Sequence, residues 1–198
     1  MNGVNNMGYH SIKDLVDLCK ANKCELWQVI MRDNANEHMI SEKQVFDNMK
    51  LMYAAMKKAD NDYNKNLKSP SEMAGGDGEL MHIYNKSGKN ICGDFISTAM
   101  EKAIKMGESN ACMKRIVAAP TAGSCGVIPA VFISYEKLYD VYEDDGVKAL
   151  FIAAGIGAVI AENASIAGAS GGCQAEIGSG SGMAAGAICY IKGGDTDQ

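Results

Sequence analysis

Hydrophobic residues in the first part of the chain recur every three or four positions, which is the spacing of one face of an α-helix. The clearest face consists of Val45, Met49, Met52 and Met56. Ser41 precedes this face, and Gln44 follows Ser41 at the spacing of a capping box, in which each side chain binds the other residue's backbone N–H. A methionine stripe can also form a binding surface, but flexible thioethers commonly fill helical cores, so we interpret this stripe as core packing.

The same spacing predicts four further helices in this part of the chain. Ser11, with Asp14 three positions later, predicts the start of the first, and residues 25–32 predict the second. A third is expected over residues 79–84, after a glycine turn. The fourth has a four-residue repeat that consists of Ile91, Phe95, Ala99 and Ala103. Residues 61–74 are polar and are expected to form a loop.

The second part of the chain differs in composition, because residues 118–198 hold 14 of the 22 glycines and one of the 13 methionines. Residues 147–161 are apolar on every side, so we expect a helix that is buried all round. Gly155 and Gly157 each weaken such a helix by about 1 kcal/mol relative to alanine, which is tolerable where another backbone packs against them. The chain is therefore predicted to be mainly α. We expect one compact helical domain over residues 1–198, with Gly/Ala-rich loops at helix N-termini and no substantial sheet.

Charge and cysteine content argue against several partners and compartments. Nineteen basic and 24 acidic residues give a net charge of −5, and no basic cluster offers a surface for nucleic acid or an anionic membrane. The longest apolar run, residues 149–161, is 13 residues long, whereas a membrane-spanning helix needs about 20. The first residues do not form a secretory signal. Seven cysteines without a C-x-x-C pair therefore predict a cytosolic protein with reduced thiols, unless some of them are metal ligands.

One segment suited to chemistry is residues 119–126, Ala-Pro-Thr-Ala-Gly-Ser-Cys-Gly, which precedes an apolar helix that starts with residues 127–132. The unpaired N–H groups of a helix's first turn, together with the positive end of its dipole, bind carboxylate or phosphate oxygens. The segment lacks the Gly-Lys-Ser/Thr ending of a phosphate-binding loop, which argues against a nucleotide. The residues alone leave two alternatives open with equal weight: an anion site, or a helix start made of small residues for packing.

A second segment, residues 163–183, is rich in glycine and follows the predicted buried helix directly. It has few apolar side chains, so we predict a loop that lets the backbone approach a ligand. Cys173 is its only soft metal ligand, and Glu176 is its only ionisable carboxylate. Taken by itself, a lone cysteine is more often a buried core residue than a ligand.

Together, the two segments resemble those of the iron–sulfur-dependent L-serine dehydratases, in particular the α chain of the two-chain type. The similarity is carried by residues 119–126, by Asn-Ala-Ser-Ile at 163–166 and by Gly-Gly-Cys-Gln-Ala-Glu at 171–176. Shorter similar segments lie at 75–77, 86–89 and 110–111. The resemblance extends over residues 11–198, and its last motif is specific enough to reverse the interpretation of Cys173 as a core residue.

The resemblance implies a cofactor and partners. In that family three cysteines hold a [4Fe–4S] cluster. Cys173 matches the first of them, and the other two ligands are expected beyond Gln198. The chain is therefore expected to be a C-terminally truncated α subunit that does not hold the cluster alone. The implied partners are L-serine, a β chain and further copies of the same chain, in a cytoplasmic enzyme of amino-acid catabolism and gluconeogenesis.

The resemblance also implies roles for the other motif residues. The substrate carboxylate would be held by the backbone N–H groups around Thr121, Ala122, Gly123 and Ser124. Asn163 and Ser165 would position the polar groups of the substrate. Glu176 would transfer a proton or position the residues that contact the substrate, or else cap the following helix. No general base is identified, because the histidines lie outside the matching motifs; they are His10, His38 and His82.

In the implied reaction, an open iron of the cluster acts as a Lewis acid on the β-hydroxyl of L-serine, and a base removes the Cα proton. The product of this dehydration hydrolyses to pyruvate and ammonia. Two other functions stay open. One is a catalytically incomplete remnant or assembly module that binds a β partner without a cluster, and the missing ligand cysteines favour it. The other is a carboxylate-binding or regulatory domain without a metal.

Overall fold

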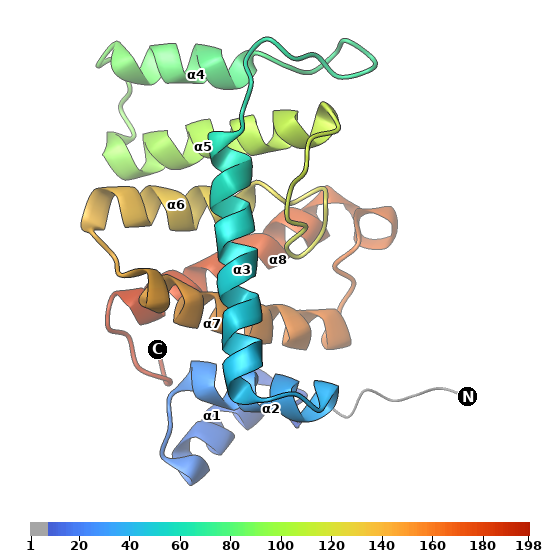
Figure 1. Ribbon diagram of the computed structural model, residues 1–198, viewed down its shortest axis with the longest axis vertical. Coiled ribbons are helices and arrows are strands. Elements are labelled where there is room, and N and C mark those ends of the chain that lie inside the picture. Colours follow the sequence, from blue (N-terminus) through green and yellow to red (C-terminus); the bar gives the residue numbers. More distant parts are fainter. Residues whose placement is uncertain (1–7) are drawn as a thin grey trace.

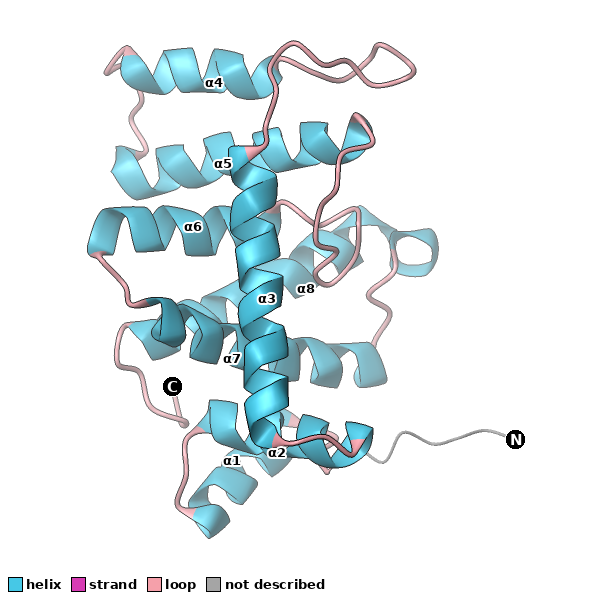
Figure 2. Ribbon diagram, viewed as in Figure 1, coloured by secondary structure: helices cyan, strands magenta, loops and turns pink. Residues whose placement is uncertain are grey.

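The computed structural model describes residues 8–198 of the chain. This part contains eight α-helices joined by loops, and no strand (Figures 1 and 2). Their bounds, in chain order, are α1 Ile12–Asn22, α2 Leu26–His38, α3 Glu42–Asn61, α4 Asp77–Lys86, α5 Gly93–Ala111, α6 Val127–Tyr139, α7 Glu143–Asn163 and α8 Gly168–Ile191. The prediction of a mainly helical fold without a substantial sheet is confirmed over these residues. No helix in this part is both long and apolar enough to span a membrane.

Helix α3 runs across the other helices and packs against α2, α5, α6 and α7 (Figure 1). From top to bottom in that view, α4, α5 and α6 lie in successive layers, and each packs against the next. Helices α7 and α8 pack against each other, and α8 also packs against α6. The apolar core lies where α1, α2, α3, α6, α7 and α8 meet. The packing of α8 on α6 is the contact that positions the candidate site.

Both predicted helix caps are present. The Ser11 side chain accepts a hydrogen bond from the Asp14 N–H at 3.1 Å, so α1 begins where the sequence predicts. Ser41 and Gln44 form the full capping box, since the Gln44 N–H donates to Ser41 Oγ at 3.2 Å and the Ser41 N–H donates to Gln44 Oε1 at 3.0 Å. These bonds satisfy N–H groups that have no partner within the helix, and each cap typically contributes about 1 kcal/mol.

The hydrophobic stripe of α3 is core packing with one exception. Val45 and Met56 are buried and Met49 is half-buried, whereas Met52 is 47% exposed. Met52 lies on the same side of α3 as the buried Val45 and Ala59, so the helical period alone does not explain its exposure.

Helix boundaries differ from the prediction in several places. The helices expected over residues 25–32 and 79–84 are longer, since α2 continues to His38 and α4 extends from Asp77 to Lys86. Helix α5 begins at Gly93, which leaves Ile91, the first member of the four-residue repeat, exposed and outside the helix. Gly93 has a φ of +72°, a left-handed conformation that the helix cannot extend through.

Helix α7 crosses the core, and nine of residues 147–161 are buried. The expected burial all round is not complete, because Ala154 and Ala161 are exposed. A Cβ at Gly155 would fall 2.7 Å from Ile30 Cγ1, and one at Gly157 would fall 2.7 Å from Met183 Cε. The close neighbours of these glycines are therefore side chains of α2 and α8, and not another backbone.

The predicted loop over residues 163–183 is wrong for most of its length. Residues 164–167 connect α7 to α8, and α8 begins at Gly168. One break interrupts α8 at Gly172, whose φ of +76° lies in the left-handed region. Glycine has a low helix propensity, but the close packing of α8 against α6 and α7 requires small residues and outweighs that cost. The loop over residues 119–126, by contrast, precedes α6 as predicted.

Candidate functional site

The two segments singled out in the sequence meet in the structure. Thr121 lies on the loop before α6, and Glu176 lies on α8, one turn beyond the break at Gly172. The Thr121 hydroxyl donates a hydrogen bond to Glu176 Oε1 at 2.8 Å, across a separation of 55 residues along the chain. Because the packing of α8 on α6 creates this contact, we take it as the centre of the candidate site.

Further hydrogen bonds hold the loop that carries Thr121. Ser124 Oγ accepts from the Thr121 N–H at 3.3 Å and lies 3.1 Å from Thr121 Oγ1. Ser124 is only 1% exposed, so the packing around it fixes its position. From the end of α5, Asn110 Nδ2 donates to the carbonyl oxygen of Ala122 at 3.0 Å. Thr121 is therefore held in the orientation that reaches Glu176.

Two glycines border the Glu176 carboxylate. A Cβ at Gly123 would fall 2.8 Å from Glu176 Cδ, and a Cβ at Gly168 would fall at the same distance of 2.8 Å from that atom. Both distances are shorter than carbon atoms tolerate, so a side chain at either position would displace the carboxylate. Glycine at both positions allows the carboxylate to lie between the loop and the start of α8.

The loop presents N–H groups that can bind an anion. Within residues 8–198, the backbone N–H groups of Ala122, Gly123 and Ser124 donate no hydrogen bond. They precede α6, whose first turn holds no acidic side chain to offset the positive end of the helix dipole. The Glu176 carboxylate contributes a negative charge next to the loop. The arrangement suits a small zwitterion, with its anionic group on the N–H groups and its cationic group near Glu176.

Cys173 directly follows the break at Gly172 and is exposed, which excludes the alternative in which it fills the core. It lies one turn from Glu176 on α8. Cys125 is buried instead, and burial raises the pKa of its thiol above the ordinary value. Within residues 8–198, no group of three or more His, Cys, Asp or Glu side chains is placed to hold a metal ion. This part of the chain thus offers one accessible thiol near the site but no complete ligand set.

The other two predicted site residues, Asn163 and Ser165, form local contacts. Asn163 Nδ2 donates to the carbonyl oxygens of His10 and Val159, both at 2.9 Å, and so ties the segment before α1 to the end of α7. The Ser165 hydroxyl pairs with the Ser170 hydroxyl at the start of α8. Among the described residues, neither side chain is hydrogen-bonded to the loop or to the site's carboxylate.

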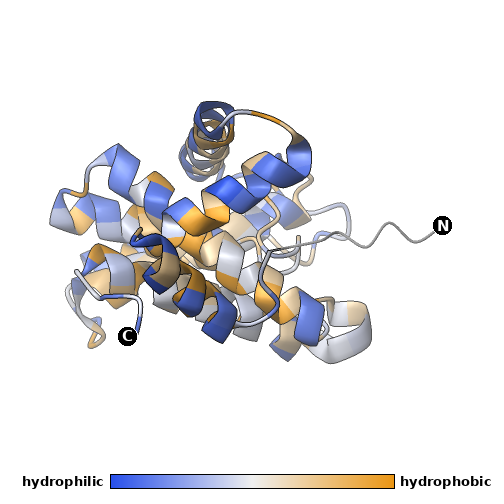
Figure 3. Cartoon of the chain, turned by 90° about the horizontal axis from the view of Figure 1, so that it is seen from below, coloured by the Kyte–Doolittle hydropathy of each residue, from blue (hydrophilic) through white to orange (hydrophobic). Residues whose placement is uncertain are grey.

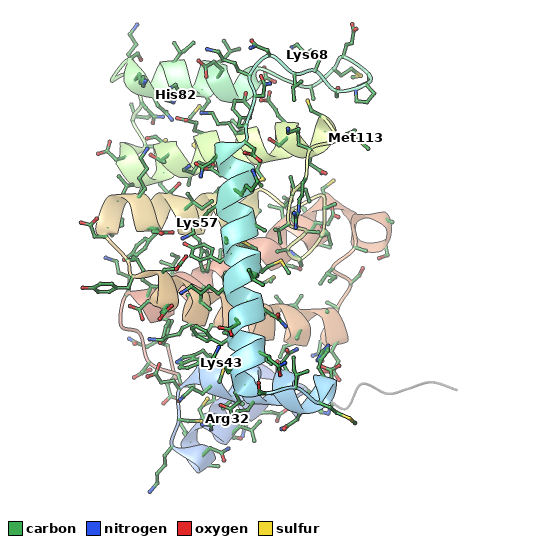
Figure 4. All side chains as sticks on the ribbon, viewed as in Figure 1. Arg32, Lys43, Lys57, Lys68, His82 and Met113 are labelled. Atoms are coloured by element: carbon green, nitrogen blue, oxygen red, sulfur yellow. The ribbon has the colours of Figure 1, made fainter. Side chains whose placement is uncertain are left out.

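The histidines lie outside the candidate site. His82 on α4 lies 2.8 Å from Glu101 of α5, above α6 and α8 in Figure 4. His10 lies 2.5 Å from Glu162, near the C-terminal end of α7. His38 ends α2. None of the three therefore supplies a general base at the Thr121–Glu176 contact.

Sequence reasoning does not identify two residues of the site. Asn110 belongs only to a short similar segment, and no local pattern shows that it reaches Ala122, because the path of the intervening loop decides that contact. Gly168 belongs to the glycine-rich segment, so a signal is present in the sequence. Its role depends on where Glu176 lies, which the sequence does not give.

Comparison with known proteins adds to this geometry. Residues 21–198 match a family described as serine dehydratase alpha chain. A protein of Bacillus subtilis (strain 168) named probable L-serine dehydratase, alpha chain, is 36% identical over 197 residues, which cover 96% of this chain and 63% of that protein. The L-serine dehydratase, alpha chain, of Peptoniphilus asaccharolyticus is 32% identical over 193 residues, or 96% of this chain and 65% of that protein. This chain thus spans just under two thirds of the length of these relatives.

Proposed function

The chain belongs to the serine dehydratase alpha chain family, and on that premise we propose that it is the α component of an enzyme that converts L-serine to pyruvate and ammonia. The names of the two relatives support L-serine as the substrate and point to a second chain as partner. Because the chain spans under two thirds of their length, we assign the activity to the assembled enzyme and not to the isolated chain. The seven cysteines, all within residues 8–198 and all free, support a cytoplasmic setting.

The Thr121–Glu176 hydrogen bond is the observation that carries this proposal. It joins the two segments on which the resemblance rests, although they lie far apart in sequence. A packing role alone would not require glycine on both sides of a carboxylate, since an apolar side chain in place of Glu176 would fill the space equally well. Two glycines that leave room for a charged group favour a binding site.

In the proposed complex, the N–H groups of Ala122, Gly123 and Ser124 hold the carboxylate of L-serine. Glu176 faces the ammonium group, whose charge it complements, and its Oε2 can accept a proton from Cα. Loss of water breaks the Cα–H bond and the bond between Cβ and the hydroxyl oxygen. The resulting enamine rearranges to an imine, which adds water and releases ammonia to leave pyruvate.

Cys173 is the residue of this chain that would hold a [4Fe–4S] cluster. Its exposed thiol fits the role of one ligand, and residues 8–198 do not provide a complete set, so we propose that the other ligands come from the rest of the assembled enzyme. When bound, a cluster with one open iron supplies a Lewis acid for the β-hydroxyl group.

A second candidate function is an assembly module that binds a β partner without a cluster. The incomplete ligand set within residues 8–198 favours it. The two functions differ in whether Cys173 matters for activity.

A complementation experiment separates these functions. An anaerobic extract from a strain that lacks its own copy of this chain is supplied with the purified chain, iron and sulfide, and pyruvate formation from L-serine is followed. We expect the wild-type chain and the Cys92→Ser variant, altered at another exposed thiol, to restore pyruvate formation, and the Cys173→Ser variant to fail. Full activity of the Cys173→Ser variant would remove this thiol from the site. Absence of pyruvate with every variant would favour the assembly module.

Substrate binding is tested separately by NMR on the ¹⁵N-labelled chain. We expect L-serine to shift the amide signals of Ala122, Gly123 and Ser124, and the Glu176→Gln variant to weaken binding because it removes the charge that complements the ammonium group. Acetate, which carries only the anionic group, should bind the variant no more weakly than the wild type, because the removed carboxylate repels an anion. Binding of L-serine without a shift at Gly123 would overturn the placement of the substrate.

A further inference from the structure

A groove of about 810 Å³ lies at the C-terminal end of α8, away from the end that carries Cys173. Its walls come from α1, from the connection between α6 and α7, from α8 and from residues 193–198. Figure 3 views the molecule from the end at which α1 and the C-terminus lie. The groove plays no part in the function proposed above, and its lining has its own chemistry.

The lining is apolar at its base and aromatic along one side. Leu15 and Ile152 are buried at its base, and four tyrosines line it, namely Tyr135, Tyr139, Tyr142 and Tyr190. Three large apolar residues of the lining remain exposed: Ile12 by 46%, Tyr139 by 52% and Tyr142 by 81%. Exposed apolar and tyrosine side chains gathered at a hollow are typical of a protein–protein interaction site.

The charged residues that line the groove are all acidic: Glu25, Asp140, Asp145 and Asp195. Lys148 lies 2.8 Å from Asp145, and among the described residues the other three carboxylates have no ion-pair partner. Tyr190 and Trp27 donate hydrogen bonds to Glu25 Oε2 at 2.7 Å and 2.8 Å, which fix this carboxylate without neutralising it. The groove therefore has a negative potential that favours a cationic partner.

The aromatic side of the groove already holds one cation. The Lys192 ammonium lies 5.6 Å from the ring centre of Tyr135 and 5.1 Å from that of Tyr139. Because Lys192 occupies these two rings, a lysine or arginine brought in by a partner would pair with the carboxylates of the groove instead.

We propose that this groove is the docking site for a basic amphipathic helix of a partner chain, with apolar side chains on the base and Lys or Arg side chains on the carboxylates. A helix that lays one apolar face in a groove is a common mode of recognition. An elongated partner fits better than a small molecule, because the hollow continues into a second one of about 480 Å³. Lys20 and Lys23 also line this second hollow, so the acidic character belongs to the first one, where the basic side chains of the partner would lie. The two hollows share Cys24, Glu25, Asp195 and Thr196.

Two cysteines in the groove provide the test. Cys24 and Cys189 line it and are half-buried, whereas Cys92 is exposed at the start of α5, outside the groove. The probe is a synthetic 14-residue helix of leucine and lysine with its leucines on one face. Rates of reaction with N-ethylmaleimide are measured for each cysteine by mass spectrometry. When the probe occupies the groove in nine-tenths of the molecules, we expect the reaction of Cys24 and Cys189 to slow about tenfold. The reaction rate of Cys92 should stay unchanged.

Matched variants separate docking from general attraction to an acidic protein. Glu25→Gln together with Asp140→Asn should abolish the protection. Asp17→Asn together with Asp47→Asn removes the same two negative charges, but from positions on α1 and α3 that do not line the groove, so this pair should preserve the protection. Asparagine tolerates the left-handed backbone at position 140, and glutamine at position 25 still accepts the bonds from Tyr190 and Trp27.

Other outcomes would overturn the proposal. The groove does not select a basic helix if a leucine–glutamate helix protects Cys24 and Cys189 equally well. The same conclusion follows if both pairs of variants lose the protection equally, or if the probe does not protect the two cysteines at all. Protection by tetraethylammonium alone would identify a site for small organic cations instead. Faster reaction of the buried Cys125 would mean that the probe opens the fold and does not dock.

Discussion

Thr121 donates a hydrogen bond to Glu176 at 2.8 Å, and this bond links the loop before α6 to the first turns of α8 after the break at Gly172. Thr121 lies on a loop that Ser124 and Asn110 also hold, and Glu176 lies on α8 one turn beyond the break. The bond therefore serves stability as well as the proposed chemistry.

Thr121→Val should lower the free energy of unfolding by about 2 kcal/mol, since it removes a hydrogen bond to a charged group while keeping the volume. Thr121→Ser retains the hydroxyl, so its free energy of unfolding is expected to fall much less. Urea unfolding of the two variants measures the difference. Equal losses would show that the methyl group, and not the bond to Glu176, stabilises the loop.

Gly123→Ala should move the Glu176 carboxylate, because the new Cβ would fall 2.8 Å from Glu176 Cδ. The carboxylate is the free end of a flexible side chain, so we expect it to give way, at a loss of about 2 kcal/mol from the bond to Thr121. In a Glu176→Ala background the same change should cost almost nothing, and the double-mutant cycle measures this coupling.

The control for this cycle is Gly178→Ala. Gly178 lies on the same helix as Glu176, and a Cβ there would meet no atom within 4 Å apart from the adjacent backbone of its own helix, so alanine should stabilise the protein by up to about 1 kcal/mol. Additive effects of Gly123→Ala and Glu176→Ala would contradict the close approach of Gly123 to the carboxylate.

Local features of the fold could be predicted from the sequence, and tertiary ones could not. Ser41 and Gln44 reveal their capping box because all of its atoms belong to neighbouring residues. Met52 is exposed although its neighbours on the same side of α3 are buried, because other helices do not cover the whole length of that side. The glycine-rich segment forms α8 because α6 and α7 pack closely on it, which its own propensity does not show.

The same limit applies to the candidate site. Thr121 and Glu176 could be selected as chemistry-bearing residues, since they lie in two unusual segments. Their contact could not be predicted, because it depends on the packing of α8 against α6. Asn163 shows the converse, since its amide binds the carbonyl oxygen of His10 across the fold, which the motif around Asn163 does not indicate.

Gly155→Ala should destabilise the protein, although alanine favours a helix by about 1 kcal/mol. The new Cβ would fall 2.7 Å from Ile30 Cγ1 and closer still to Cδ1, and overpacking of this kind typically costs 1–3 kcal/mol, or about 2 kcal/mol here. Ile30→Val removes Cδ1 and by itself should cost about 1 kcal/mol. The double variant should lose less free energy of unfolding than the sum of the losses in the two single variants. Thermal unfolding of the wild type, the two single variants and the double variant checks this. Strict additivity would show that the two residues do not meet.

Glu108 connects α5 to the start of α4 and provides a pH-dependent contribution to stability. Its carboxylate accepts hydrogen bonds from the Tyr63 hydroxyl at 2.7 Å and from the backbone N–H groups of Asp77 at 2.6 Å and Gly78 at 3.2 Å. Burial raises the pKa of Glu108, but these hydrogen bonds outweigh burial and hold it below the ordinary value of 4.5. The charged form is therefore the one that the folded protein stabilises.

Glu108→Gln should lower the free energy of unfolding by about 2 kcal/mol at pH 7, because the amide cannot replace a charged acceptor of three hydrogen bonds. A carboxylate whose pKa is lowered by folding contributes its full stability above pH 4.5, and that contribution is lost as the pH falls through the lowered pKa. The gap in free energy of unfolding between wild type and variant should therefore shrink as the pH falls from 5 to 3. Urea unfolding across this range measures it. Glu79→Gln is the control, since Glu79 pairs with Lys65 at the surface and should have a smaller effect. A gap that stays constant down to pH 3 would contradict the role of the charged carboxylate.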